Sequence, residues 1–98
     1  MRSSQQVVKD ADITYRQLDY WTRTGCVHAR GDDAPGSGFW RVYDDDEYRV
    51  ITLIARLTKA GVSLDVAATA ARDAFVDEDS GTFETSIGRG LTVAGAIR

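Results

Sequence analysis

Apolar residues recur three or four positions apart in several segments of the chain, which is the spacing of one helix face. The pattern predicts a short first helix at 5–11, after the capping hydroxyls of Ser3 and Ser4. It predicts a second helix from an N-cap at Thr14 to about residue 24, where Gly25 suits a left-handed stop. The first helix is so short that tertiary packing must stabilise it.

The second helix has one apolar and one polar face. Leu18 and Trp21 lie three positions apart on the apolar face and should point to a core. The remaining positions carry aromatic, amide and charged side chains: Tyr15, Arg16, Gln17, Asp19, Tyr20 and Arg23. A helix that reads DNA needs donors and acceptors at its exposed N-terminal end, and this helix offers them. The alternative is a solvated polar face without a partner.

Two further helices are predicted after residue 43. The first opens with the acidic run Asp44–Glu47, which complements the helix dipole, and it ends at Gly61. Its apolar stripe consists of Val50, Ile51, Ile54 and Leu57. Ser63 caps the other helix. The apolar face there carries mostly small residues that permit close packing: Val66, Ala67, Ala70, Ala71 and Ala74.

Two short extended runs lie between the second and third helices. The runs at 26–30 and 39–43 flank a segment at 31–38 that contains three glycines and the one proline. Such a segment must be a loop, so the three parts together predict a two-stranded wing with a long tip.

The last part of the chain is predicted to be an acidic linker at 76–81 followed by a β-hairpin. The hairpin strands at 82–87 and 91–97 flank a three-residue loop at 88–90. Gly95 weakens the second strand, and a lone hairpin is marginally stable, so it must pack on the core or on a partner chain. One face of this strand consists of Leu91, Val93 and Ile97.

Composition limits the classes of protein. A chain of 98 residues with 43% hydrophobic residues suits one small globular domain. The single cysteine excludes an internal disulfide and suits a reducing cytoplasm. The net charge of −3 is unevenly spread, because residues 1–43 hold six basic and five acidic side chains and residues 44–98 hold six and ten. We therefore expect weak electrostatic steering toward DNA, modest affinity per protomer and a need for dimers or neighbouring molecules.

Residues 12–64 contain a predicted helix, the wing and a second predicted helix, in this order. There ITYRQLDYW is followed by GSG, then by Arg41 and Tyr43 in an R-x-Y pattern, then by AGVSL. This segment resembles the winged helix-turn-helix head of the MerR family, most closely the branch with these motifs. The resemblance implies a bacterial or phage protein of the cytoplasm, associated with the nucleoid.

The resemblance and the pattern together predict a mainly α fold with little β structure. We expect a winged helix-turn-helix of four helices and a two-stranded wing, with a C-terminal β-hairpin. The DNA-binding domain should cover 1–75, and the linker and hairpin at 76–98 should serve dimerisation or a partner. Most members of the family have a coiled coil after the head, but nothing after Ala74 has heptad character. No small-molecule effector is therefore expected, and self-association or a protein partner is assigned to the hairpin.

The resemblance implies that double-stranded DNA is the partner. Arg16 would pair with guanine or phosphate, Gln17 with adenine or phosphate, and Arg41 with the flanking backbone or minor groove. Many members carry an Arg where this chain has Asp19, so that contact is not carried over, and Asp19 is expected to pair with Arg16 or Arg23. The predicted DNA-binding residues are Thr14, Tyr15, Arg16, Gln17, Tyr20, Arg23, Arg30, Ser37, Gly38, Arg41 and Tyr43.

Other chemistry has little support in the sequence. Cys26 and His28 are too few for a metal site, which needs three or four ligands, and Cys26 is expected to be a small buried residue. Trp40 is expected to be buried against Leu18 and Trp21. Because the chain has no paired nucleophile and base, no GxGxxG and no Walker motif, we expect neither an enzyme nor a cofactor.

Three functions remain open at this stage. The first is a small transcription regulator that reads the major groove with the helix at 14–24 and holds the backbone with the wing around Arg41. The second is an excisionase, or recombination directionality factor, which would bind side by side and bend DNA. The third is a protein-interaction module without DNA contact, which the acidic second half and the hairpin would suit.

Overall fold

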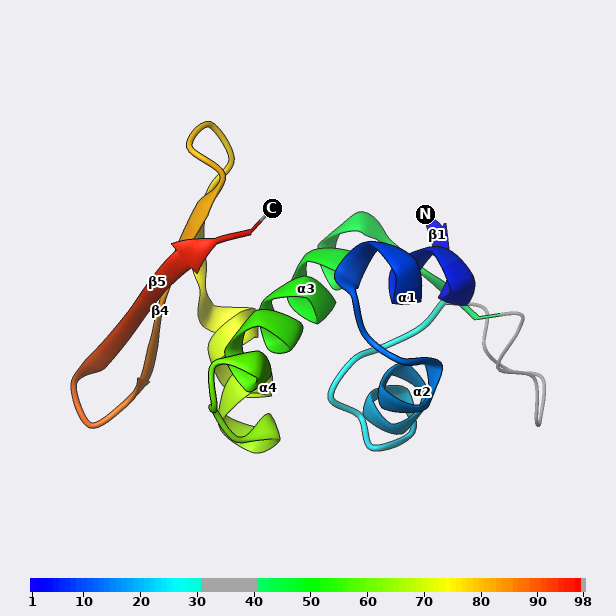
Figure 1. The fold of residues 1–98 in the computed structure, drawn as a ribbon, viewed down its shortest axis with the longest axis horizontal. Coiled ribbons are helices and arrows are strands. Elements are labelled where there is room, and N and C mark those ends of the chain that lie inside the picture. Colours follow the sequence, from blue (N-terminus) through cyan, green and yellow to red (C-terminus); the bar gives the residue numbers. More distant parts are fainter. Residues whose placement is uncertain (31–40, 98) are drawn as a thin grey trace. The chain divides into compact units, whose positions relative to one another are not determined.

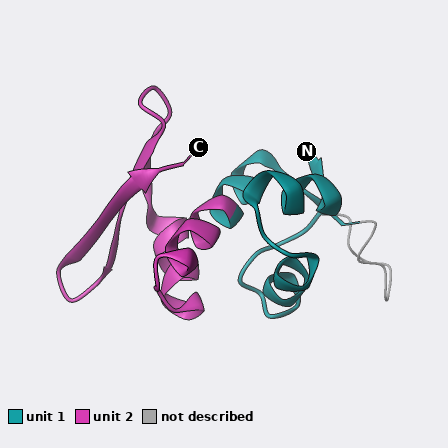
Figure 2. Ribbon diagram, in the orientation of Figure 1, with its two compact units in different colours: residues 1–51 teal, residues 52–98 magenta. Residues whose placement is uncertain are grey.

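A computed structural model describes residues 1–30 and 41–97 (Figure 1). The helices are α1 (Ser4–Ala11), α2 (Tyr15–Arg23), α3 (Asp45–Lys59) and α4 (Leu64–Asp73). The strands are β1 (Arg2–Ser3), β2 (Val42–Tyr43), β3 (Phe75–Asp77), β4 (Thr82–Gly88) and β5 (Leu91–Ala96). The chain divides into two compact units, Met1–Ile51 and Thr52–Arg98, and the boundary falls within the sequence of α3 (Figure 2). In the described ranges, no helix combines the length and apolar character that crossing a membrane requires.

The first two helices begin with the same local structure. The backbone N–H of Gln6 donates to the Ser3 hydroxyl at 3.3 Å, and the Ser3 N–H donates to the Gln6 side chain at 3.0 Å. Thr14 and Gln17 form the equivalent capping box at the start of α2. A capping box satisfies two backbone donors that a helix start otherwise leaves unpaired. The predicted N-caps at Ser3 and Thr14 are thus confirmed, as is the left-handed Gly25 after α2, with a φ of 84°.

The first unit has a compact apolar core. Leu18 and Trp21 on the inner face of α2 are buried, as predicted. The other buried apolar residues come from α1, the segments on either side of α2, β2 and the first half of α3: Val7, Ala11, Ile13, Val27, Tyr43 and Ile51. Burial of this stripe fixes which face of α2 remains in solvent.

The wing differs from the sequence prediction at its base. The prediction of a strand at 26–30 is wrong. This segment forms only an isolated bridge, in which the Arg30 N–H donates to the Val42 carbonyl at 2.7 Å. Strand β1 was not predicted; it pairs antiparallel with β2 and places Arg2 opposite Tyr43. Two residues are too few to show an alternating pattern, so no local signal marked this strand.

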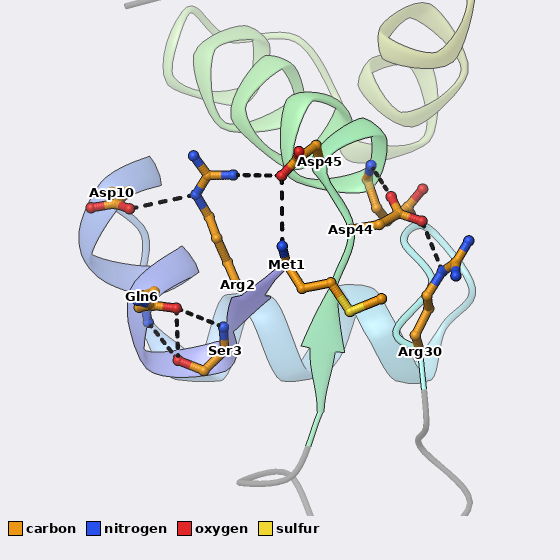
Figure 3. A network of polar contacts seen from close by, with 9 residues as sticks. Met1, Arg2, Ser3, Gln6, Asp10, Arg30, Asp44 and Asp45 are labelled. Carbon is orange, nitrogen blue, oxygen red and sulfur yellow. Dashed lines mark hydrogen bonds and ion pairs between the residues drawn. The ribbon is translucent and has the colours of Figure 1, made fainter.

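Ion pairs hold β1 beside the start of α3 (Figure 3). The Arg2 guanidinium lies 3.2 Å from Asp45 and 3.8 Å from Asp10, and it stacks on the Tyr48 ring at 3.9 Å. Each pair is partly exposed and weak by itself, but together they join α1, β1 and α3. The acidic run predicted to open α3 thus has specific partners as well as a favourable position on the helix dipole.

In the second unit, α4 packs against a three-stranded antiparallel sheet in the order β3-β4-β5. The expected acidic linker is partly wrong, because its first residues belong to β3, which pairs with β4. The hairpin itself is present, but Gly88 pairs with Leu91, so the loop is two residues long. Arg89 and Gly90 have φ values of 55° and 74°, the left-handed geometry that suits the twist of a two-residue turn.

Close packing explains two features of the second unit. Ala67, Ala70 and Ala71 are buried as predicted, whereas Val66 is exposed. Gly95 lies opposite Phe83, and a Cβ there would meet the ring at 3.2 Å. The glycine that seemed to weaken β5 therefore makes room for a buried aromatic ring.

Thr85 connects β4 to α4. Its hydroxyl is buried and donates to the Ala70 carbonyl at 2.6 Å. We expect Thr85→Val to lower the free energy of unfolding by about 1 kcal/mol, because the shape is kept and one buried hydrogen bond is lost. Urea denaturation measures this change, with the exposed Thr92→Val as the control. An equal effect of both substitutions would contradict the assigned role.

Candidate nucleic-acid interface

The N-terminal face of α2 is an exposed polar surface of the first unit. Thr14, Tyr15, Arg16, Gln17 and Tyr20 are all exposed, as the sequence predicted for this face. Within the described residues, Arg16 forms no hydrogen bond or ion pair. Its guanidinium, which has five N–H donors and a permanent charge, is therefore available to an external acceptor.

The capping box limits what Gln17 can offer. Its Oε1 accepts from the Thr14 backbone N–H at 2.9 Å and from the Thr14 hydroxyl at 3.3 Å. A bidentate contact to adenine needs both the oxygen and the amide nitrogen of the side chain. With the oxygen used inside the protein, Gln17 presents mainly its Nε2 donor, which favours the phosphate option over the adenine option.

The Thr14 hydroxyl stabilises α2 through the same contact. It accepts from the Gln17 backbone N–H at 3.0 Å. We expect Thr14→Ala to reduce the free energy of unfolding by roughly 1 kcal/mol, the usual loss for an N-cap hydroxyl. Chemical denaturation tests this, and Thr14→Ser, which keeps the hydroxyl, should stay close to the wild type. A Thr14→Ala variant with the same free energy of unfolding as the wild type would show that the cap does not stabilise the protein.

Asp19 binds two arginines at once. Its Oδ2 accepts from Arg23 Nε at 2.9 Å, and its Oδ1 accepts from Arg41 Nη1 at 2.8 Å. The predicted pairing with Arg23 is therefore confirmed, and the alternative pairing with Arg16 is not observed. The Arg41 contact was missed, since it joins positions 22 residues apart and no local pattern indicates it.

Arg41 is held firmly at the start of the wing strand. Its side chain is only 14% exposed, whereas that of Arg23 is 63% exposed. The buried Ser4 hydroxyl donates to the Arg41 carbonyl at 3.3 Å, so α1 also fixes the backbone at this position. A phosphate that contacts Arg41 would have to share the guanidinium with Asp19 or displace the Asp19 carboxylate.

Tyr43 does not lie on the exposed surface. The side chain is fully buried, and its hydroxyl shares a 2.8 Å hydrogen bond with Thr22 Oγ1. Because Thr22 donates its own proton to the Leu18 carbonyl at 2.8 Å, the Tyr43 hydroxyl is the donor in this pair. Tyr43 thus packs the wing strand onto α2 and does not belong to the candidate interface.

The base of the wing has a second arginine–carboxylate pair. Arg30 Nε donates to Asp44 Oδ2 at 3.0 Å, and the other Asp44 oxygen accepts from the Glu47 backbone N–H at 2.8 Å (Figure 3). The Glu47 N–H and then the Arg30 charge hold the pKa of Asp44 below its ordinary value. Ser37, Gly38 and Trp40, which the sequence assigned to the wing, lie outside the described residues.

Glu47 has a role that the sequence did not reveal. The side chain is buried, and its Oε2 accepts from the His28 backbone N–H at 2.6 Å, which fixes the segment after α2. Cys26 is half-buried with its sulfur 3.5 Å from the Thr24 hydroxyl. Across the described ranges, no group of three or more His, Cys, Asp or Glu residues could hold a metal ion.

Comparisons with known proteins agree with this geometry. The sequence model of the MerR HTH family of regulatory proteins matches residues 2–74. The chain is 46% identical over 54 residues to uncharacterised HTH-type transcriptional regulators of Mycobacterium bovis and of two Mycobacterium tuberculosis strains. The match covers 55% of this chain and 24% of each relative, so the chain spans about a quarter of their length. No solved structure matches significantly.

The matched residues contain all of α1, α2, the described part of the wing, α3 and α4. The family consists of DNA-binding transcription regulators and not of enzymes, in agreement with the expectation from the sequence. The chain belongs to the MerR helix-turn-helix family of regulatory proteins.

Proposed function

We propose that this chain is a sequence-specific DNA-binding regulator that places the N-terminal end of α2 in the major groove. The observation that carries the proposal is the exposed face at the start of α2, where Arg16 has no ion pair within the described part of the chain. Membership of a family of DNA-binding regulators supports the same conclusion.

Each exposed residue of α2 has a distinct proposed role. Arg16 donates to guanine O6 and N7, the commonest specific contact in the major groove. Gln17 donates from Nε2 to a phosphate, because its oxygen is bound to Thr14. Tyr20, which is 51% exposed, reaches the sugar–phosphate backbone through its hydroxyl. Thr14 and Tyr15 lie at the helix start, where the dipole favours a phosphate.

The remaining contacts come from the flanks of α2. Arg23 and Arg30 are each 63% exposed and are proposed to bind phosphates on either side of the groove. Arg41 is proposed to bind a phosphate either while it stays paired with Asp19 or after the phosphate has displaced Asp19. Backbone contacts by Ser37 and Gly38 at the wing tip stay predictions from the sequence.

The test begins with selection of a binding site from a random duplex library. Methylation interference at guanine N7 then asks whether the protein uses the major groove. We expect N7 methylation of at least one guanine in the selected site to block wild-type binding and to matter far less for Arg16→Ala. Selection of no site, or binding that ignores major-groove methylation, would contradict the proposal.

The spacing of sites separates regulation from recombination. Regulation is our preferred function because the matched relatives are named transcriptional regulators. A footprint of one or two half-sites in a promoter is expected. A side-by-side array next to an attachment site would instead support the excisionase alternative.

We also propose that the chain associates with a second copy through β5. This strand is an edge of its sheet, and along the described residues nothing pairs with its outer side. Leu91, which lies in this strand, is 59% exposed. Unpaired strand edges readily add another strand. Sedimentation equilibrium should show a dimer that Leu91→Lys weakens and that Phe75→Lys, on the opposite edge strand, does not. A monomer at all concentrations would exclude the dimer.

A further inference from the structure

The Asp19 carboxylate occupies a place that suits a phosphate. Arg23 approaches one oxygen through Nε, and Arg41 approaches the other through Nη1, at 2.9 and 2.8 Å. Guanidinium groups bind carboxylate and phosphate with the same planar fork of N–H donors. The cluster of Asp19, Arg23 and Arg41 therefore already has the donor arrangement of a phosphate site, with an internal anion in it.

The three members differ in accessibility. Arg23 is 63% exposed, Asp19 is 28% exposed and Arg41 is 14% exposed. The Arg23–Asp19 pair spans one helical turn at the surface, where such pairs are weak and easily exchanged. The Arg41–Asp19 pair is more shielded from solvent and from screening by salt. A competing anion would therefore reach Arg23 first.

We propose that Asp19 is an intramolecular competitor for DNA phosphate. In the free protein it neutralises part of the charge of Arg23 and Arg41, so a phosphate must displace the carboxylate to gain these contacts. The inference rests on the proposed DNA-binding function, because the competing phosphates belong to the duplex that α2 enters. Its consequence is reduced affinity for DNA of any sequence, while Arg16, which Asp19 does not contact, remains free for base recognition.

The competition has a specific signature in salt dependence. Each additional phosphate contact releases counterions and makes the slope of log K against log salt steeper by about 0.9. If Asp19 withholds one contact, its neutralisation should raise affinity for random-sequence duplex roughly fivefold to tenfold at about 0.1 M salt. A residue that only stabilised the fold would not make this slope steeper.

The first experiment measures binding of a random-sequence duplex at several salt concentrations. We expect Asp19→Asn to bind more tightly with a steeper slope, and Asp19→Glu to stay close to the wild type. Asp73→Asn, an exposed aspartate of α4 in the other unit, makes the same change in net charge and should alter neither value. An unchanged or shallower slope for a folded Asp19→Asn would overturn the inference.

A second measurement takes its deciding result from the wild-type chain. The Arg23 Nε–Hε group should give a protected NMR resonance that shifts on addition of random-sequence duplex. In free Asp19→Asn this resonance should lose protection, while the Arg30 resonance, held by Asp44, should not change. A DNA-bound wild type with an unmoved Arg23 resonance would refute the competition alone. Absence of salt-sensitive binding by the wild type and all variants would refute the proposed function as well.

Discussion

Arg16→Ala is expected to weaken binding to the selected DNA site by about 1–3 kcal/mol, roughly fivefold to 150-fold in Kd. Arg16 is exposed at the start of α2, and among the described residues nothing binds its guanidinium. The substitution therefore removes a potential base contact without breaking an internal ion pair. Alanine also has high helix propensity, so the fold should be retained.

Two further variants show whether the loss is specific. Arg16→Lys keeps the charge but lacks the planar fork, so it should recover binding to random DNA more than binding to the selected site. Arg56→Ala removes an exposed arginine from α3 and should leave both affinities unchanged. Fluorescence anisotropy with selected and random duplexes measures these differences. A similar loss for Arg16→Ala and Arg56→Ala would mean that only net charge matters.

Tyr43→Ala is expected to lower the free energy of unfolding by about 3–5 kcal/mol, the usual cost of removing a buried aromatic ring. Tyr43 is fully buried in the first unit, and its hydroxyl donates to Thr22. Tyr43→Phe keeps the ring but removes the hydroxyl with its hydrogen bond to Thr22, and it should cost about 1 kcal/mol. For a domain of this size the larger loss is a substantial part of the total stability.

Urea denaturation followed by tryptophan fluorescence measures both changes, since Trp21 belongs to the same core. DNA affinity adds an independent readout. Tyr43→Phe should bind DNA like the wild type, because the hydroxyl lies inside the protein and not at the interface. Weaker DNA binding by a stable Tyr43→Phe would return this residue to the set of contacts that the sequence first suggested.

The helices could be predicted because their signals are local. The hydroxyl caps at Ser3 and Thr14 and the left-handed glycines at Gly25 and Gly61 mark helix ends within a few residues. The small-residue face of α4 followed from spacing alone. The expected end of the DNA-binding domain at residue 75 separates two proposed functions of the chain, and it stays a prediction.

The contacts that could not be predicted join distant parts of the chain. The two-residue strand β1 exists because it pairs with β2, and β3 exists because it pairs with β4. Tyr43 was predicted to bind DNA from its place in the R-x-Y motif, and two residues of β2 are too few to show that its side chain faces inward. For the candidate site, the sequence indicated which face of α2 is exposed, but not that Arg41 binds Asp19 or that Gln17 caps its own helix.

The most direct test of the account is a titration of the wild type and Arg16→Ala against selected and random duplexes over a range of salt concentrations. We predict that the wild type prefers the selected site, that its affinity falls as salt rises, and that Arg16→Ala loses most of the preference. Equal binding of both proteins to both duplexes, or no binding by the wild type even at low salt, would contradict DNA reading by α2.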